Sequence, residues 1–215
     1  IIETEALPIN LTVGRILASD LKAGSDSPPF SNSAVDGYAF GFADAGGKYL
    51  ELKQGRSAAG HPFSQTIDKG QAIRIFTGAV LPAGTDTVVL QEDVKLEGNK
   101  IYFENSLQLG ANTRTIGEDI KKGQIIAFKR DPVTAFMAAS SISSGIRRAQ
   151  VYRKLRVGVF STGDELIDFE KPLKFGSVFD VNSPMLASLL KAWGYEVYEL
   201  GKIPDNLEVL RDKLN

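Results

Sequence analysis

The segment VGVFSTGDELI (157–167) joins a run of hydrophobic residues to a turn rich in glycine, hydroxyl and carboxylate groups. Strand and helix patterns then alternate along the chain, at 157–160 (strand), 183–193 (helix), 196–200 (strand) and 207–214 (helix). This alternation predicts a parallel α/β sheet. Only one complete strand-helix-strand unit precedes Asn215, so we expect this α/β domain to be truncated.

The turn in this segment has a position that favours ligand binding. In an open α/β sheet, ligands bind beyond the carboxyl ends of the strands. Ser161, Thr162, Gly163, Asp164 and Glu165 follow the first strand directly, so they could hold a phosphate group, a cation or both. The same residues also suit a purely structural turn. No lysine follows the glycine as in a Walker phosphate loop, and no dinucleotide fingerprint is present.

Capping residues predict where two helices begin and end. Asn182 is a good N-cap for the helix of the α/β pattern, and Gly194 ends that helix. A second helix is predicted over 132–149, with Asp131 as its N-cap and Pro132 at its first position. Its alanines and serines indicate close packing.

The part of the chain from about 28 to 126 has a different character. Gly, Pro, Asn and Asp interrupt short strand-like segments at 72–76, 87–91 and 100–103. This rhythm is typical of an all-β unit, and we expect a barrel or a sandwich. Gly98-Asn99 lies between two such segments and predicts a hairpin turn, because both residues tolerate positive φ.

Composition excludes several classes of function. The 215 residues include 25 Lys and Arg against 26 Asp and Glu, which disfavours a general binder of nucleic acid or membrane surfaces. No apolar run approaches the roughly 20 residues of a membrane span, and no secretory signal is evident, so a cytoplasmic location is expected. There is no cysteine and a single histidine, His61, so any metal must be held by oxygen ligands, which suits magnesium.

Three further segments carry chemical groups, and each also has a structural interpretation. PPFSNSAVDGYA (28–39) contains Asp36-Gly37, a turn pair that could present a carboxylate. FTGAVLPAG (76–84) offers the hydroxyl of Thr77 beside a glycine-rich backbone, which suits an oxyanion or a plain loop. RTIGEDI (114–120) combines a cation with carboxylates, as a solvated turn with a local ion pair also does.

The order and spacing of these segments resemble one family over nearly the whole chain. The matching segments are SPPFSNSAVDGYAF (27–40), TGAVLPAGTDTVVLQED (77–93), RTIGEDIKKG (114–123), VGVFSTGDELI (157–167) and VFDVNSPML (178–186). They look like the MoeA family of molybdopterin molybdenumtransferases, which includes the C-terminal domain of gephyrin and the plant fusion enzymes.

The resemblance implies a multidomain α+β and α/β protein that forms an elongated homodimer. A discontinuous linking domain would take residues 3–21 and 123–153, a β-rich domain would be inserted at 22–122, and the α/β molybdopterin-binding domain would start at 154. The implied reaction cleaves the phosphoanhydride of adenylated molybdopterin with magnesium, places molybdate on the dithiolene and releases AMP. The molybdopterin adenylyltransferase is the implied protein partner, with no nucleic-acid or membrane partner.

Carried over residue by residue, the resemblance implies a set of site residues. The catalytic residues would be Asp36, Thr77, Asp119 and Glu165. The substrate-binding residues would be Ser161, Thr162, Gly163, Asp164 and Asn182, and the metal ligands would be Asp36, Asp164 and Glu165. In the family the cleft lies between two subunits, so Asp36, Thr77 and Asp119 are expected to act across the dimer.

Departures from the family pattern are small within the matched segments. Val35 stands where methionine is usual, and Asp180-Val181-Asn182 where a serine is common. The family's SGG segment and its lysine- and proline-rich segment lie beyond Asn215, so this piece alone is expected to be nearly inactive. A gephyrin-type scaffold and a relative with the same α/β fold but different chemistry stay open as alternatives, although such relatives lack the β-rich insertion.

Overall fold

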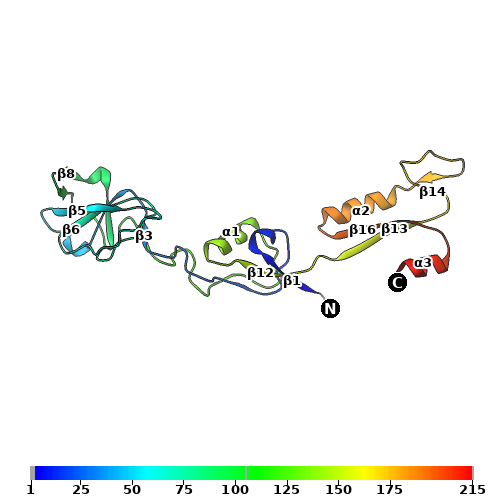
Figure 1. Cartoon of the computed structure of the whole chain (residues 1–215), viewed down its shortest axis with the longest axis horizontal. Coiled ribbons are helices and arrows are strands. Elements are labelled where there is room, and N and C mark those ends of the chain that lie inside the picture. The colour runs from blue at the N-terminus through cyan, green and yellow to red at the C-terminus, as the bar shows by residue number, and fades with distance from the viewer. Residues whose placement is uncertain (1–2, 105, 215) are drawn as a thin grey trace.

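The computed structural model describes residues 3–104 and 106–214, and it is elongated. Three regions follow one another along its longest axis (Figure 1): a strand-rich sheet unit, a central unit that contains α1, and an α/β unit. The chain begins in the central unit, passes through the sheet unit, returns to the central unit and then enters the α/β unit.

The central unit is built from two segments that are far apart in sequence. Its elements are β1 (Thr4–Pro8), η1 (Ile9–Leu11), β2 (Leu21–Lys22), β11 (Ile125–Ala127), α1 (Ala135–Ser143) and β12 (Arg148–Tyr152). β1 pairs with β12 and β2 pairs with β11, both antiparallel. Leu17, Val133 and Val151 belong to one buried apolar cluster that joins the two segments.

Helix α1 is shorter than the sequence predicts. It begins at Ala135 because Thr134 is its N-cap, with a hydroxyl that accepts a hydrogen bond from the Met137 amide. The predicted cap, Asp131, instead accepts a hydrogen bond from the Phe128 amide. The expected C-terminal end of the helix, near 149, is strand β12, since the helix ends at Ser143. The predicted boundaries of this helix are therefore wrong at both ends.

Two chain segments run side by side from the central unit to the sheet unit (Figure 1). Ser27 forms a bridge with Ile120, and farther along β3 (Asn32–Ser33) pairs with β10 (Thr113–Arg114), again antiparallel. The segments that enter and leave the sheet unit therefore lie next to each other.

The sheet unit contains one mixed six-stranded sheet. Its strands are β4 (Gly37–Phe40), β5 (Leu50–Ser57), β6 (Gln71–Ile75), β7 (Thr87–Leu90), β8 (Lys95–Glu97) and β9 (Lys100–Tyr102), with η2 (Phe42–Asp44) and η3 (Gln91–Asp93) between them. The order is β7-β4-β6-β5-β9-β8, and only β5 and β6 are parallel. The hairpin at Gly98-Asn99 is confirmed, because Glu97 pairs with Lys100.

Both faces of this sheet are packed. Side chains alternate between the faces of a strand, and the neighbours Ala72 and Ile73 belong to two different apolar clusters, as do Val89 and Val88. In the described residues no ladder joins the edge strands β7 and β8. The strand pairing thus closes no barrel, and apolar clusters cover both faces of one sheet where a barrel or two stacked sheets were expected.

Gly37 lies in a strand, and the predicted Asp36-Gly37 turn is wrong. Gly37 is the first residue of β4 and pairs with Ile75 and Leu90. A Cβ atom at this position would lie 2.0 Å from the carbonyl oxygen of Val89, closer than any side chain tolerates. The glycine is therefore required by the close approach of β7.

The α/β unit confirms the predicted alternation of strands and helices. Its elements are β13 (Arg156–Thr162), β14 (Leu166–Ile167), β15 (Val178–Phe179), α2 (Asn182–Ala192), β16 (Glu196–Ile203) and α3 (Leu207–Leu214). β13 and β16 are parallel, and α2 packs against both. Gly194, at φ +86, ends the turn after α2 as predicted. Asn182 is the first helical residue and not the cap, because the Asp180 carboxylate accepts the hydrogen bond of the Ser183 amide.

The molecule as a whole is rich in strands and has few helices. No helix in the described part of the chain has the length and apolar character that a membrane span requires.

Candidate functional site

The predicted site residues fall into two groups that lie in different parts of the molecule. Asp36, Thr77 and Asp119 belong to the sheet unit and the segments that lead to it, whereas the turn 161–165 and Asn182 belong to the α/β unit. One chain alone does not bring the two groups together. The expected metal set therefore splits, because Asp36 lies between β3 and β4 in the sheet unit, and Asp164 and Glu165 lie between β13 and β14 in the α/β unit (Figure 1).

Asp36 is oriented by Thr77. Its Oδ1 accepts hydrogen bonds from the amide and from the hydroxyl of Thr77, both at 2.8 Å. These two bonds lower the pKa of Asp36 below its ordinary value of 3.8, and the positive charge of Arg74 acts in the same direction. Asp36 is thus held as a carboxylate, with Oδ1 engaged and in a fixed direction.

Arg74 lies beside this pair. Its Nη1 donates to the carbonyl oxygen of Gly37 at 3.2 Å, and its Nη2 donates to the side chain of Gln91. The guanidinium carbon lies 5.1 Å from the ring centroid of Tyr38 and 4.8 Å from that of Phe76. The sequence did not single out Arg74, since a lone arginine in a strand pattern carries no signal.

Asp119 makes the local ion pair that its structural interpretation predicts. The Arg114 Nη2 donates to Asp119 at 2.6 Å, and the Arg114 Nε donates to Glu118 at 3.3 Å. All three side chains are exposed, so these pairs contribute little to stability. The structure links Asp119 to Arg114 but shows no bond between Asp119 and Asp36 or Thr77.

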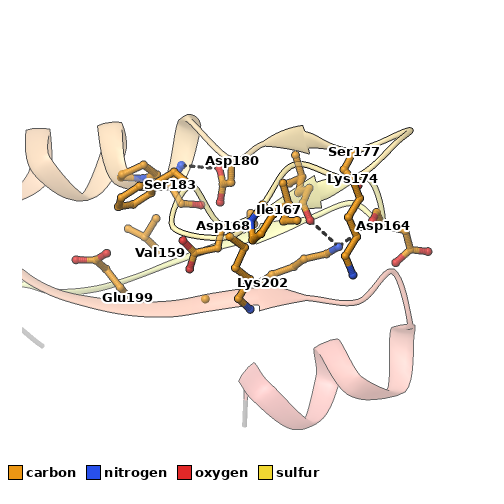
Figure 2. Close-up of a pocket in the computed structure, with 17 residues that line it drawn as sticks. Val159, Asp164, Ile167, Asp168, Lys174, Ser177, Asp180, Ser183, Glu199 and Lys202 are labelled. Atoms are coloured by element: carbon orange, nitrogen blue, oxygen red, sulfur yellow. Dashed lines mark hydrogen bonds between the residues drawn. The ribbon is translucent and has the colours of Figure 1, made fainter.

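The α/β unit contains a cavity of about 770 Å³ lined by the carboxyl-terminal halves of β13 and β16 and by the segments around β14 and β15 (Figure 2). Of the predicted substrate-binding residues, Ser161 and Asp164 line it. Thr162, Gly163 and Asn182 are not among the lining residues, and neither is Glu165. The charged residues that line the cavity are Asp164, Asp168, Lys171, Lys174, Asp180, Glu199 and Lys202. A cavity of this size and polarity suits a small charged ligand.

Lys202 fixes the turn that carries Glu165. Its Nζ donates to the carbonyl oxygens of Asp164 and Leu166, both at 3.0 Å, and Figure 2 shows its side chain reaching from β16 to that turn. The turn also needs Gly163, which has φ +134, and a Cβ there would lie 2.7 Å from Oε2 of Glu165. Lys202 was not predicted, because its role depends on a strand nearly forty residues away in sequence.

Asp180 and Ser161 both line the cavity. Partial burial tends to raise the pKa of Asp180, but hydrogen bonds from the Ser183 side chain and amide outweigh it and lower the pKa below 3.8. Ser161 lies close enough to Asp180 to help lower this pKa. Its buried Oγ nevertheless forms no hydrogen bond of acceptable geometry with any described residue. A buried hydroxyl without a partner is suited to a ligand. Asp180, three residues before Ser183, could have been found as a helix-capping residue.

The carboxylates of the turn fit magnesium only together with a ligand. No group of three His, Cys, Asp or Glu side chains that could hold a metal ion occurs within 3–104 and 106–214. Magnesium is usually bound by one or two carboxylates plus substrate phosphates. Asp164 and Glu165, adjacent and exposed, match that mode of binding.

Two family models match the chain. Residues 1–145 match the model described as the MoeA N-terminal region (domain I and II), and residues 158–215 match the model described as "Probable molybdopterin binding domain".

Curated and solved relatives agree with these matches. A molybdopterin molybdenumtransferase of Haemophilus influenzae is 40% identical over 95% of this chain and 51% of its own length, and one of Nostoc is 34% identical over 99% and 50%. The crystal structure of a molybdopterin biosynthesis MoeA protein from Pyrococcus horikoshii superposes with a TM-score of 0.86, at 33% identity, over 100% of this chain and 58% of that one. The chain thus spans about half the length of the curated relatives it matches.

Proposed function

The chain belongs to the MoeA family, and from this premise we propose that it is part of a molybdopterin molybdenumtransferase. The reaction proposed is the insertion of molybdate into adenylated molybdopterin, with cleavage of the phosphoanhydride and release of AMP. The relatives from Haemophilus influenzae and Nostoc are molybdopterin molybdenumtransferases, which supports a role in molybdenum cofactor biosynthesis. The cytoplasm is the proposed location, and a molybdopterin adenylyltransferase is the proposed supplier of the adenylated substrate.

The observation that carries the proposal is the cavity at the carboxyl-terminal halves of β13 and β16. It combines Asp164, the unpartnered hydroxyl of Ser161 and the cation of Lys202 at the edge where α/β sheets bind ligands. A phosphorylated pterin needs hydrogen-bond donors for its polar atoms and a positive charge near its phosphate. This cavity supplies both, with Thr162, Gly163 and Asn182 in the adjoining turn and helix end.

Asp164 and Glu165 are the residues proposed to hold magnesium against the substrate phosphates. A bound magnesium ion would supply charge stabilisation for the departing AMP. Glu165 is exposed and points from a turn that Lys202 fixes, so its carboxylate needs little reorganisation to meet a cation. Asp164 contributes the second carboxylate from the cavity wall.

The residues of the sheet unit are proposed to serve the cavity of a second subunit. Asp36 and Thr77 lie in the sheet unit and Asp119 in a segment that leads to it, whereas Glu165 lies in the α/β unit, so an antiparallel homodimer would complete each site. Asp36 would orient an attacking oxygen, and Thr77 would direct Asp36. The pairing of β1 with β12 supports a division into a linking domain (3–21 and 123–153), a β-rich insertion (22–122) and an α/β domain from 154.

The test is molybdate-dependent release of AMP from adenylated molybdopterin by the full-length protein with magnesium. In Glu165→Gln we expect release to fall by about 100-fold, because one carboxylate ligand is lost while the volume is kept. Glu170→Gln is the matched control, as it removes an exposed carboxylate from the same region, and it should leave release unchanged. A well-folded dimer that releases no AMP would overturn the proposal in favour of a scaffold.

A further inference from the structure

A pair of arginines lies on one face of the sheet unit, beside Asp36 and Thr77. Arg56 on β5 and Arg74 on β6 are register partners in the parallel pair of strands. The register of β5 shifts between Leu52 and Arg56, and Gly55 within this irregular stretch has φ +116. Such bulges commonly redirect a side chain near a functional site. The irregularity places Arg56 directly opposite Arg74.

Both guanidinium groups face the same aromatic ring. The Arg56 guanidinium carbon lies 5.9 Å from the ring centroid of Phe76, and that of Arg74 lies 4.8 Å from it. Cation–π contacts hold the arginines in place without neutralising their charge. Phe76 directly precedes Thr77, so the arginine pair lies close to the hydroxyl that donates to Asp36.

Neither arginine makes a direct ion pair with a described residue, although the charge of Arg74 acts on the carboxylates of Asp36 and Glu92. In the described part of the chain, neither arginine has a carboxylate oxygen within 4.0 Å. The hydrogen bonds of Arg74 go to neutral oxygens, those of Gly37 and Gln91. Two like charges held near one aromatic ring repel one another. An anion bound by both arginines would offset this repulsion.

We propose that Arg56 and Arg74 form an oxyanion subsite that takes a phosphoryl group of the substrate. The inference rests on the proposed function and extends it, because it names where the sheet unit holds the phosphate. Arginine suits this task, since its planar donors match phosphate oxygens in pairs. The subsite would hold the phosphate near Asp36, whose Oδ1 is engaged by the amide and the hydroxyl of Thr77.

The experiment measures binding of AMP to the full-length protein by calorimetry at low salt, with inorganic phosphate as competitor. Arg56 is exposed, so Arg56→Gln should fold normally, which circular dichroism checks. We expect the dissociation constant for AMP to rise by roughly tenfold, the effect of losing a charge-assisted hydrogen bond. Phosphate should compete with AMP in the wild type, and Arg56→Lys should restore only part of the affinity, because lysine keeps the charge but not the paired donors.

Lys100→Gln is the matched control. Lys100 belongs to the same sheet and lies 3.9 Å from the ring centroid of Tyr49, so it is also a cation over an aromatic ring. It should leave AMP binding unchanged. AMP binding that is insensitive to Arg56→Gln, or that phosphate does not affect, would overturn the subsite. Because no molybdopterin or molybdate is used, a failed AMP-release assay would count against the proposed function and not against this inference.

Discussion

The sheet unit and the α/β unit each present a carboxylate that the sequence singled out, but they hold it differently. In the sheet unit, Asp36 receives two hydrogen bonds from Thr77 and keeps one direction. In the α/β unit, Glu165 is exposed beside Gly163, and Lys202 fixes the backbone of its turn through two carbonyl oxygens. Asp36 is thus oriented by hydrogen bonds to its own carboxylate, whereas Glu165 is positioned by hydrogen bonds to the backbone of its turn.

This difference separates two tasks. A carboxylate whose oxygen already accepts two hydrogen bonds is suited to orienting a substrate, because these bonds restrict the rotation of its side chain. A carboxylate with free oxygens is suited to a cation, which needs those oxygens as ligands. The comparison thus supports Asp36 as a directing residue and Glu165 as a metal ligand, in line with the roles proposed above.

The largest expected effect comes from Gly37→Ala, which would break one side of the comparison. The new Cβ would meet the Val89 carbonyl oxygen at 2.0 Å, and overpacking of this kind costs about 3 kcal/mol or more. We expect amide exchange to accelerate across β4, β6 and β7 while the amides of β13 and β16 stay protected. Gly24→Ala, with contacts no closer than 3.4 Å, is the control and should change little. Equal loss of protection in both units would show that they unfold together.

A smaller effect is expected from Lys202→Met, which tests the other side. The methionine keeps the apolar stem but donates no hydrogen bond to Asp164 and Leu166, so the turn should loosen. We expect AMP release to fall by about tenfold, mainly in kcat, with faster amide exchange in residues 163–168.

The control for this prediction is Lys213→Met. Lys213 belongs to the same unit but is exposed on α3 and does not line the cavity. Its loss should affect neither the exchange of the turn nor the release of AMP. If Lys202→Met leaves residues 163–168 as protected as before, Lys202 does not fix the turn.

The smallest effect is expected from Thr77→Val, read in the pKa of Asp36. The hydroxyl bond is removed while the amide bond stays, so the pKa should rise part of the way towards 3.8. Because the pKa is lowered in the folded protein, ionised Asp36 stabilises the fold above pH 3.8, and that contribution is lost as the pH falls through the lowered value. Thr77→Val should lose it at a higher pH. NMR titration of the Asp36 carboxyl carbon measures this, and Thr77→Ser should behave as the wild type.

The sequence predicted what depends on local pattern. The α/β alternation and the hairpin at Gly98-Asn99 are such features, because periodicity and turn residues specify them. The helix beginning at Ala135 was misplaced, since Asp131 and Thr134 are both good caps and only tertiary contacts select one. Gly37 was taken for a turn residue, because the close approach of β7 cannot be seen in sequence.

For the candidate site, the sequence identified the turn 161–165 but not the groups that support it. Ser161 and Asp164 do line a cavity, as their place after a strand indicates. Lys202, Arg56 and Arg74 were missed, because each acts through residues distant in sequence or on a neighbouring strand. The expectation that Asp36 and Glu165 share one site stays a prediction, since one chain holds them apart.

The two neighbouring segments that join the sheet unit to the central unit have a consequence for the order of folding. Leu21 pairs with Ala127, so the central unit can form only when about a hundred residues between them have been brought back to one place. Closing so long a flexible loop costs conformational entropy that grows with the logarithm of its length. A sheet unit that folds first shortens that loop to its two connecting segments, so the central unit should assemble quickly after it and slowly without it.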